Sequence, residues 1–108
     1  MIKSVKFNIP ISIKKIESFL NNPSYEIREE TKTIVLDYFE TALDLKINQN
    51  SEIEEVYCHD EFLCNEENLL GFAYAILPEE SNFIIAYDSI GTEYRYDKKA
   101  LEEFLDEY

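Results

Sequence analysis

Residues 69–89 read LLGFAYAILPEESNFIIAYDS, two almost wholly apolar runs separated by the polar, turn-forming segment 78–82. Short apolar runs bounded by turn residues are typical of strands that are buried on both faces of a sheet. We therefore predict two strands, 69–77 and 83–89, joined as a hairpin. Gly91 marks a second turn, and residues 93–96 are the expected third strand of a meander in the C-terminal half.

The last segment of the chain is predicted to be an amphipathic helix that Asp97 caps. Its apolar stripe consists of Ala100, Leu101, Phe104, Leu105 and Tyr108. Lys98 and Lys99 fall in the first turn, and the acids that follow them are Glu102, Glu103, Asp106 and Glu107. Both placements oppose the helix macrodipole, at about 0.3–1 kcal/mol per exposed charge at low salt. We expect these acids to be retained for a role outside the fold.

The N-terminal segment begins with an alternating pattern that is typical of a half-buried strand. We predict this strand over residues 2–9, with Val5, Phe7 and Ile9 on its buried face and Pro10 at its end. Ser12 is then expected to cap a short helix. The apolar positions of that helix are Ile13, Ile16, Phe19 and Leu20.

The segment 31–45 supports two interpretations. Its apolar residues follow a helical spacing, and they are Ile34, Val35, Tyr38, Phe39, Ala42 and Leu45. Its β-branched residues favour a hairpin instead, with strands over 25–29 and 33–38. We prefer the helix and keep the hairpin as the alternative.

The middle of the chain has weaker patterns. Alternation at Leu43, Leu45 and Ile47 indicates a strand that begins as the preferred helix ends. Residues 48–51 read NQNS and are predicted to form a turn. The secondary structure of 52–68 is left open, and its expected buried residues are Ile53, Val56 and Tyr57.

These patterns predict a single α+β domain over residues 1–108, an antiparallel sheet with two or three helices packed on it. A chain of 108 residues buries enough surface to fold without a metal or a disulfide. With only 2 Gly and 3 Pro, the sequence offers no flexible linker.

Cys58, His59, Asp60, Glu61 and Cys64 form the one cluster of metal-binding residue types. Structural zinc sites usually place two cysteines two to four residues apart and add a second ligand pair, which this chain lacks. Adjacent Cys58 and His59 point to opposite faces of an extended chain and cannot act as a catalytic pair. We therefore expect two reduced thiols, no metal, no cofactor and no enzyme.

Charge is the outlying property of the composition, with 10 Lys and Arg, 23 Asp and Glu, and a net charge of −13. Such a field repels nucleic acid and anionic membranes and attracts basic partners. Residues 47–94 contain no Lys or Arg, and their acids are the expected contacts. The candidate partner-binding residues are Glu52, Glu54, Glu55, Asp60, Glu61, Glu66, Glu67, Glu79 and Glu80.

The expected function is a non-enzymatic inhibitor whose acidic surface mimics nucleic acid and blocks a basic site on a partner protein. Immunity proteins against nuclease toxins and phage-encoded inhibitors of DNA-cutting defence systems share this small, acidic character, although no motif of the chain matches one such family. The alternative is a small regulatory or accessory interaction domain. We expect a cytoplasmic, bacterial or phage protein with no signal peptide, no membrane span and no direct nucleic-acid contact. The oligomeric state is not specified by the sequence.

Overall fold

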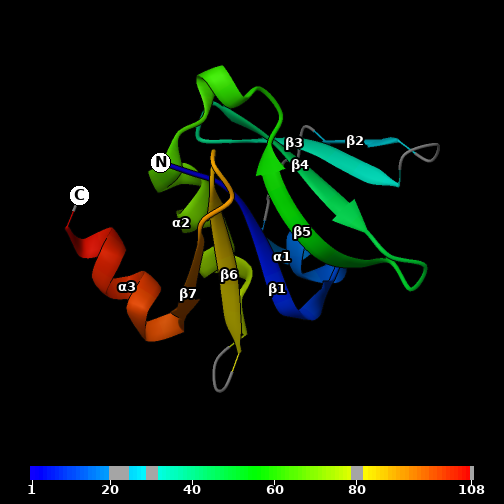
Figure 1. Cartoon of the computed structure of the whole chain (residues 1–108). Helices are drawn as coiled ribbons and strands as arrows, with labels where there is room; N and C mark the ends of the chain where they lie inside the picture. The colour runs from blue at the N-terminus through cyan, green and yellow to red at the C-terminus, as the bar shows by residue number, and fades with distance from the viewer. Residues whose placement is uncertain (20–24, 29–31, 79–81, 108) are drawn as a thin grey trace.

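The computed structural model describes residues 1–19, 25–28, 32–78 and 82–107. Its strands form a single antiparallel 7-stranded sheet in the order β2-β3-β4-β5-β1-β6-β7, and helices pack on it, as the α+β prediction requires (Figure 1). The strands are β1 (Ile2–Ser12), β2 (Tyr25–Arg28), β3 (Thr33–Tyr38), β4 (Thr41–Ile47), β5 (Glu52–Cys58), β6 (Phe83–Asp88) and β7 (Glu93–Asp97). The helices are α1 (Lys14–Phe19), the single turn η1 (Glu61–Leu63), α2 (Glu66–Ile76) and α3 (Lys98–Asp106).

α2 corrects the prediction of a strand over 69–77 and of its hairpin to 83–89. The helix begins at Asn65, whose side chain accepts a hydrogen bond of 3.0 Å from the Asn68 N–H. Its apolar run is long because α2 is enclosed by α1, α3 and the strands β1, β3, β4 and β5. A helix that is buried on most sides has the same continuous apolar sequence as a central strand.

The hairpin β3–β4 replaces the helix preferred for 31–45, and the alternative pairing of 25–28 with 33–38 is confirmed. Two residues join β3 to β4, Phe39 with φ 48° and Glu40 with φ 70°. Two consecutive positive φ angles are those of a type I′ hairpin turn, which usually contains Asn and Gly. The β-branched residues therefore decided the structure of this segment, and the helical spacing was misleading.

β1 lies near the centre of the sheet, between β5 and β6. The strand continues through Pro10 to Ser12, so the prediction that it ends at Pro10 is wrong. Its pairing with β5 is irregular between Lys6 and Ile11, and this irregularity leaves Ile9 54% exposed instead of buried. Ser12 caps α1 as predicted, with its Oγ accepting from the Lys14 N–H at 3.3 Å. Leu20 and the side chain of Phe19 lie outside the described part of the chain.

The C-terminal half follows its prediction from residue 83 onward. β6 and β7 pair through the turn at Gly91, and the Asp97 carboxylate accepts from the Ala100 N–H at 2.7 Å to cap α3. The Lys98 ammonium, which opposes the dipole of α3, donates to the Leu77 carbonyl at 3.0 Å. That carbonyl belongs to the C-cap of α2, where a cation is favourable. Lys98 therefore stabilises the neighbouring helix at the expense of its own.

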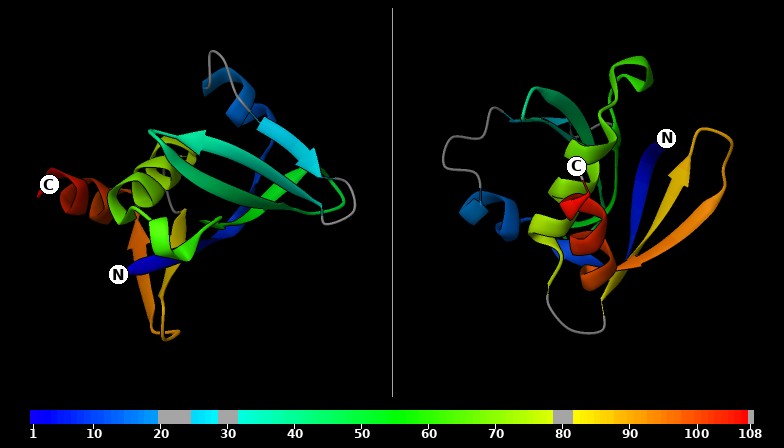
Figure 2. Two further views of the ribbon diagram at one scale, coloured as in Figure 1. Left: turned by 90° about the horizontal axis from the view of Figure 1, so that it is seen from above. Right: turned by 90° about the vertical axis from the view of Figure 1, so that its left-hand side faces the viewer.

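The core fills the space between one face of the sheet and α2 (Figure 2). Strand residues such as Val5, Leu45 and Val56 meet Leu70 and Phe72 of α2 there, all of them fully buried. The expectation of Ile53 and Val56 as buried is confirmed, whereas Tyr57 is only half-buried. α2 spans this core from end to end, so its two termini mark two opposite ends of the molecule (Figure 2).

Candidate protein-binding end

Three connections, the N-terminal residues and the C-terminal turn of α3 meet at the N-terminal end of α2 (Figure 1). The Ile2 N–H donates to Glu66 Oε1 at 2.8 Å, and Ile2 also pairs with Asp88 at the end of β6. Asn68 Nδ2 donates to the Phe39 carbonyl at 2.9 Å and to Thr41 Oγ1 at 2.8 Å. These bonds join the N-terminus, the β3–β4 turn and the β6–β7 turn to one end of one helix.

We call this region the acidic end and define it as residues 1–4, 37–42, 58–68, 87–94 and 104–107. Its only Lys or Arg is Lys3. Its acids are Asp37, Glu40, Asp60, Glu61, Glu66, Glu67, Asp88, Glu93, Asp106 and Glu107. Because the segments come from distant parts of the chain, folding concentrates the negative charge well beyond its density along the sequence.

Only part of the predicted contact set lies at the acidic end. Asp60, Glu66 and Glu67 are there, and Glu61 belongs to η1 between them. The length of β5 separates these residues from Glu52 and Glu54, which lie in the first three residues of that strand at its far end. Glu55 lies between Lys6 of β1 and Lys46 of β4 in the strand register, so its charge is flanked by two cations. Glu79 and Glu80 lie outside the described residues.

Some acids of this end hold the fold together. Asp60 Oδ1 accepts from the Phe62 N–H at 2.9 Å, and Asp88 Oδ1 accepts from the N–H groups of Ile90 and Thr92 at 3.0 and 2.9 Å. Burial alone would raise the pKa of Asp88, but these bonds and the one from the Tyr94 hydroxyl outweigh it and lower the pKa. Glu40, Glu67, Asp106 and Glu107 make no side-chain hydrogen bond or ion pair within the described residues, so they remain available.

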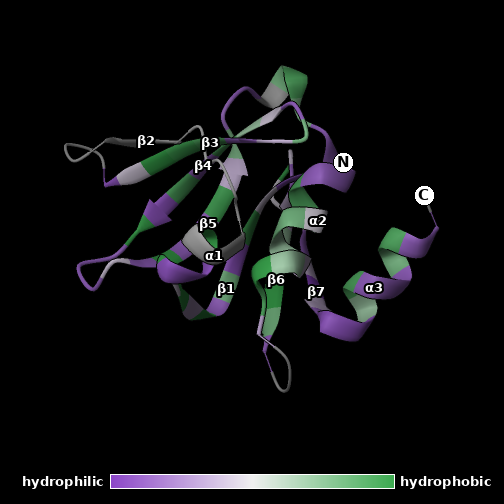
Figure 3. Ribbon diagram, turned by 180° about the vertical axis from the view of Figure 1, so that it is seen from behind, coloured by the Kyte–Doolittle hydropathy of each residue, from purple (hydrophilic) through white to green (hydrophobic). Residues whose placement is uncertain are grey.

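Large apolar side chains are exposed among these acids, and sequence reasoning missed them. Phe62 is 89% exposed, Leu63 76%, Ile90 86% and Phe39 72%. Each lies in a turn of the acidic end, and η1 is the apolar projection at the top of Figure 3. Phe62 and Leu63 are the only apolar residues between the two cysteines. This apolar pair in a polar segment was the clue to their exposure that the sequence offered.

A disulfide closes the segment that carries this pair. Cys58 and Cys64 form a disulfide, so the prediction of two reduced thiols is wrong for this structure. The end of β5 and the residues before α2 bring the two Cα atoms to 5.5 Å, which lies within the usual Cα–Cα range of a disulfide. His59 Nδ1 lies 2.9 Å from Asp44 Oδ1, away from the sulfurs. No group of three or more His, Cys, Asp and Glu is placed to hold a metal in the described ranges.

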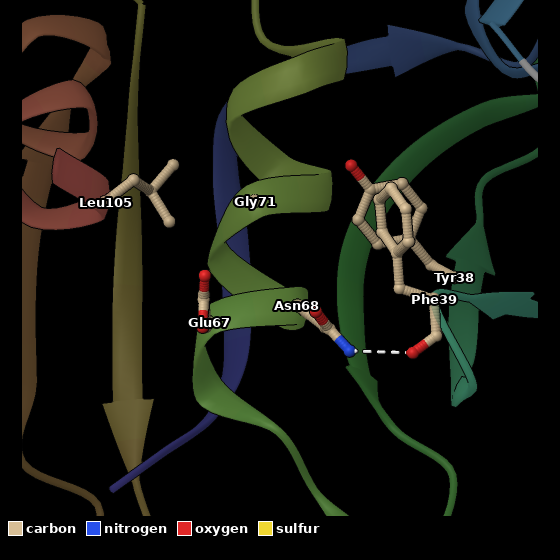
Figure 4. A pocket seen from close by; sticks show the side chains of 6 residues that line it. All are labelled: Tyr38, Phe39, Glu67, Asn68, Gly71 and Leu105. Atoms are coloured by element: carbon tan, nitrogen blue, oxygen red, sulfur yellow. Dashed lines mark hydrogen bonds between the residues drawn. The ribbon is translucent and has the colours of Figure 1, made fainter. Parts of the chain in front are cut away.

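A groove runs across α2 between the β3–β4 turn and α3 (Figure 4). Its volume is about 390 Å³, and it is lined by Tyr38, Phe39, Glu67, Asn68, Gly71 and Leu105. Tyr38 packs edge-on against Phe72 below it, at 5.2 Å between ring centroids, and burial raises the pKa of its hydroxyl. Gly71 forms the floor, and Glu67 is the charged lining residue.

The face of the sheet that α2 does not cover is mixed in charge. Tyr57 lies there beside Asp44 in the register, and burial, then Asp44 and Glu55, raise the pKa of its hydroxyl. Arg95 stacks over the Phe83 ring at 3.8 Å on the same face. Cations and anions alternate across this surface, so the acidic end is the more coherent negative region.

Comparison with family models, with curated protein sequences and with solved structures finds no match to this chain. No helix in the described ranges has the length and apolar character needed to cross a bilayer.

Proposed function

We propose that this protein is a non-enzymatic inhibitor that places its acidic end against a basic, nucleic-acid-binding site of another protein. The observation that supports the proposal is the coincidence, at one end of the molecule, of unpartnered acids with exposed Phe39, Phe62 and Leu63. Charge of one sign steers the encounter, and apolar side chains that become buried supply most of the affinity. The surface thus competes with phosphates for the same Lys and Arg side chains.

An immunity protein or a phage-encoded anti-defence protein would act in this way. Both kinds of inhibitor must bind a DNA-processing enzyme quickly and tightly, which calls for electrostatic steering as well as a well-packed anchor. Asp60 supports the second requirement, because its side chain accepts from the Phe62 N–H at 2.9 Å and its carbonyl accepts from the Leu63 N–H at 3.0 Å, which orders this turn before binding and lowers the entropy lost on association.

Capture with nucleic-acid competition tests the proposal. The protein is immobilised, extracts of bacterial and phage-infected cells are applied, and the retained proteins are identified by mass spectrometry. We expect basic nucleic-acid-binding proteins that a short DNA duplex releases. Their binding should weaken steeply as ionic strength rises, because exposed charges are screened beyond about 10 Å at 0.1 M salt. Retained proteins that DNA does not displace would reject the proposal and favour the accessory-domain alternative.

Two variants with the same change in charge localise the contact. Asp106→Lys reverses an available acid of the acidic end, and Glu54→Lys reverses an acid at the start of β5. We expect the first to weaken binding about tenfold at low salt and the second to change it less than about twofold. A second pair of changes, Phe62→Ser with Leu63→Ser, should raise the dissociation rate without changing the salt dependence. Equal effects of Asp106→Lys and Glu54→Lys would show that net charge, not this end, directs binding.

We place the encounter in the cytoplasm, where DNA-processing enzymes act. Disulfides are rare in a reducing cytosol, so this location requires that the Cys58–Cys64 bond be reduced in the cell. Alkylation of thiols during rapid lysis of the host, followed by mass measurement, checks this. A fully oxidised pair in freshly lysed cells would contradict the cytoplasmic location.

A further inference from the structure

The groove across α2 offers a more specific contact. Resting on the proposed function, we propose that the groove receives one apolar side chain from a segment of the partner that carries Lys or Arg on both sides of it. The floor, the wall and the charge of the groove support this assignment independently.

The floor of the groove is uncovered at Gly71, because glycine has no side chain. The fold does not require glycine at this position. Gly71 has helical backbone angles, and an added Cβ would meet nothing closer than Tyr38 Cε1 at 3.9 Å, an ordinary contact. Glycine within a helix lowers stability relative to alanine by about 1 kcal/mol. The sequence therefore leaves the middle of α2 uncovered at a measurable loss of stability, which a surface that accepts a foreign side chain explains.

The wall contains a side chain in an unfavourable place for folding alone. Phe39 occupies the left-handed region at φ 48° at a turn position where Asn is usual, and it is 72% exposed. Its ring packs edge-on against Tyr38 at 4.6 Å, and Asn68 fixes its carbonyl at 2.9 Å. Strain of this kind persists where the surroundings determine the conformation, and it is concentrated at functional sites. An apolar guest between Phe39 and Leu105 would cover both.

The charge of the groove selects the residues beside the guest. Glu67 lines the groove, and the acids next to the other lining residues in the chain are Asp37, Glu40, Glu66 and Asp106. No Lys or Arg adjoins any lining residue. A segment with cations on both sides of the guest therefore fits, whereas a second copy of this chain, with its net charge of −13, is repelled. The volume of about 390 Å³ is at the low end for binding pockets, and it has room for one large apolar side chain and part of the segment beside it.

Labelled pentapeptides Lys-Lys-X-Lys-Lys test the inference directly by fluorescence polarisation at low salt. We expect peptides with X as Leu, Met or Phe to bind at least about tenfold more tightly than the peptide with X as Ser, because burial of such a side chain gives a difference of that size. Affinity that is independent of X, or no binding at all, would overturn the inference.

Three variants assign the preference to the groove. Phe39→Ser removes the wall and Gly71→Leu fills the floor, and each should reduce the difference between X as Leu and X as Ser to less than about threefold. Ile90→Ser is the control, since Ile90 is 86% exposed at the acidic end but does not line the groove. Circular dichroism should show the same fold for all three. A preference that survives both groove variants would overturn the inference, even if Gly71→Leu alone proved unstable.

The two proposals fail in different ways. DNA competition with a whole partner tests the proposed function, and dependence on X tests the groove. If DNA does not displace the partner but the peptides still bind more tightly with an apolar X, the groove inference stands and the proposed function is rejected. The groove would then bind basic segments with an apolar residue for another purpose. Analytical ultracentrifugation adds a further control, because self-association that Phe39→Ser abolishes would identify a second copy as the occupant and overturn the inference.

Discussion

The two ends of α2 use charged side chains differently. At the N-terminal end are the acidic end and its exposed apolar side chains, and at the C-terminal end are Lys14, Lys15, Lys98 and Lys99 of α1 and α3 (Figure 1). Lys98 is bonded to the Leu77 carbonyl and lies 5.1 Å from the Tyr74 ring centroid, so it contributes to the fold. Glu40, Glu67, Asp106 and Glu107 have no such contacts among the described residues. At one end a lysine stabilises the fold, and at the other end several acids have no partner among the described residues.

The difference arises because α2 and the strands β1, β5, β6 and β7 run between the two ends. Each passage carries the chain from one end to the other, so residues close in sequence, such as Glu54 and Asp60, are separated by β5. Residues far apart in sequence, such as Phe39 and Leu105, meet across α2. The electrostatic asymmetry is therefore a property of the topology more than of the sequence runs.

The largest stability effect is expected from the disulfide at the acidic end. Replacing Cys58 and Cys64 by Ser should lower the free energy of unfolding of the oxidised protein by about 2 kcal/mol, from the loop-closure entropy of a short ring. Urea titrations of the variant and of the protein with a reducing agent should give the same midpoint. If these midpoints equal that of the oxidised protein, the disulfide organises only the local loop and does not stabilise the fold.

A smaller effect is expected at the opposite end. Lys98→Met keeps the aliphatic stem and removes the bond to the Leu77 carbonyl, so the free energy of unfolding should fall by about 1 kcal/mol. Lys99→Met is the control, because Lys99 is exposed, and it should change stability by less than about 0.5 kcal/mol. If both variants behave alike, the charge of this end does not stabilise the fold.

Reversing the charge of Asp106 should raise stability, in contrast to the two changes above, which lower it. Asp106→Lys places a cation in the last turn of α3, where the helix dipole favours it, so the free energy of unfolding should rise by about 0.5 kcal/mol. The same change is expected to weaken binding of a basic partner. Thermal unfolding at low salt measures the first effect, and a decrease in stability would show that Asp106 has a structural role.

The smallest effect is expected at alkaline pH. Burial raises the pKa of Tyr38 beside the groove, and burial followed by Glu66 and Tyr94 raises the pKa of Tyr96. The folded state therefore holds these protons more tightly than the unfolded state. Their contribution to stability is complete below about pH 10, the unfolded value, and is lost as pH rises through the folded pKa values. Absorbance of tyrosinate should rise later in the native protein than in urea, and coincident titrations would contradict the assignment.

Local patterns predicted the elements that local contacts hold together. The Asp97 cap, the Gly91 turn and the α3 helix each depend on residues a few positions apart, and all are found as expected, although Leu101 is the one fully buried residue of the described stripe and Tyr108 lies outside the described residues. Residues 69–77 could not be assigned from the same patterns, because enclosure of α2 on most sides removes the periodicity that separates helix from strand. Asn65, with Glu66 and Glu67 behind it, was the overlooked evidence for a helix start.

The candidate site was less predictable than the fold. Glu67 belonged to the expected contact set, but Phe39 was assigned to the buried stripe of a helix, since a Phe–Glu sequence gives no hint of a type I′ turn. Phe62 and Leu63 are exposed because η1 lies outside the packed layers of the fold. The spacing of apolar residues in the sequence does not predict that position. Which acids remain free also depends on tertiary partners, as the capping role of Asp88 illustrates.

The position of β1 sets the time at which this chain folds. β1 is synthesised before both of its partners, β5 and β6, and Ile2 pairs with Asp88. The centre of the sheet therefore stays incomplete on the ribosome until residues near 88 have left the exit tunnel, and such distant pairings fold slowly. We expect that chains interrupted before β6 cannot form this core and are degraded, so that only translation through β6 yields a protein that withstands proteases.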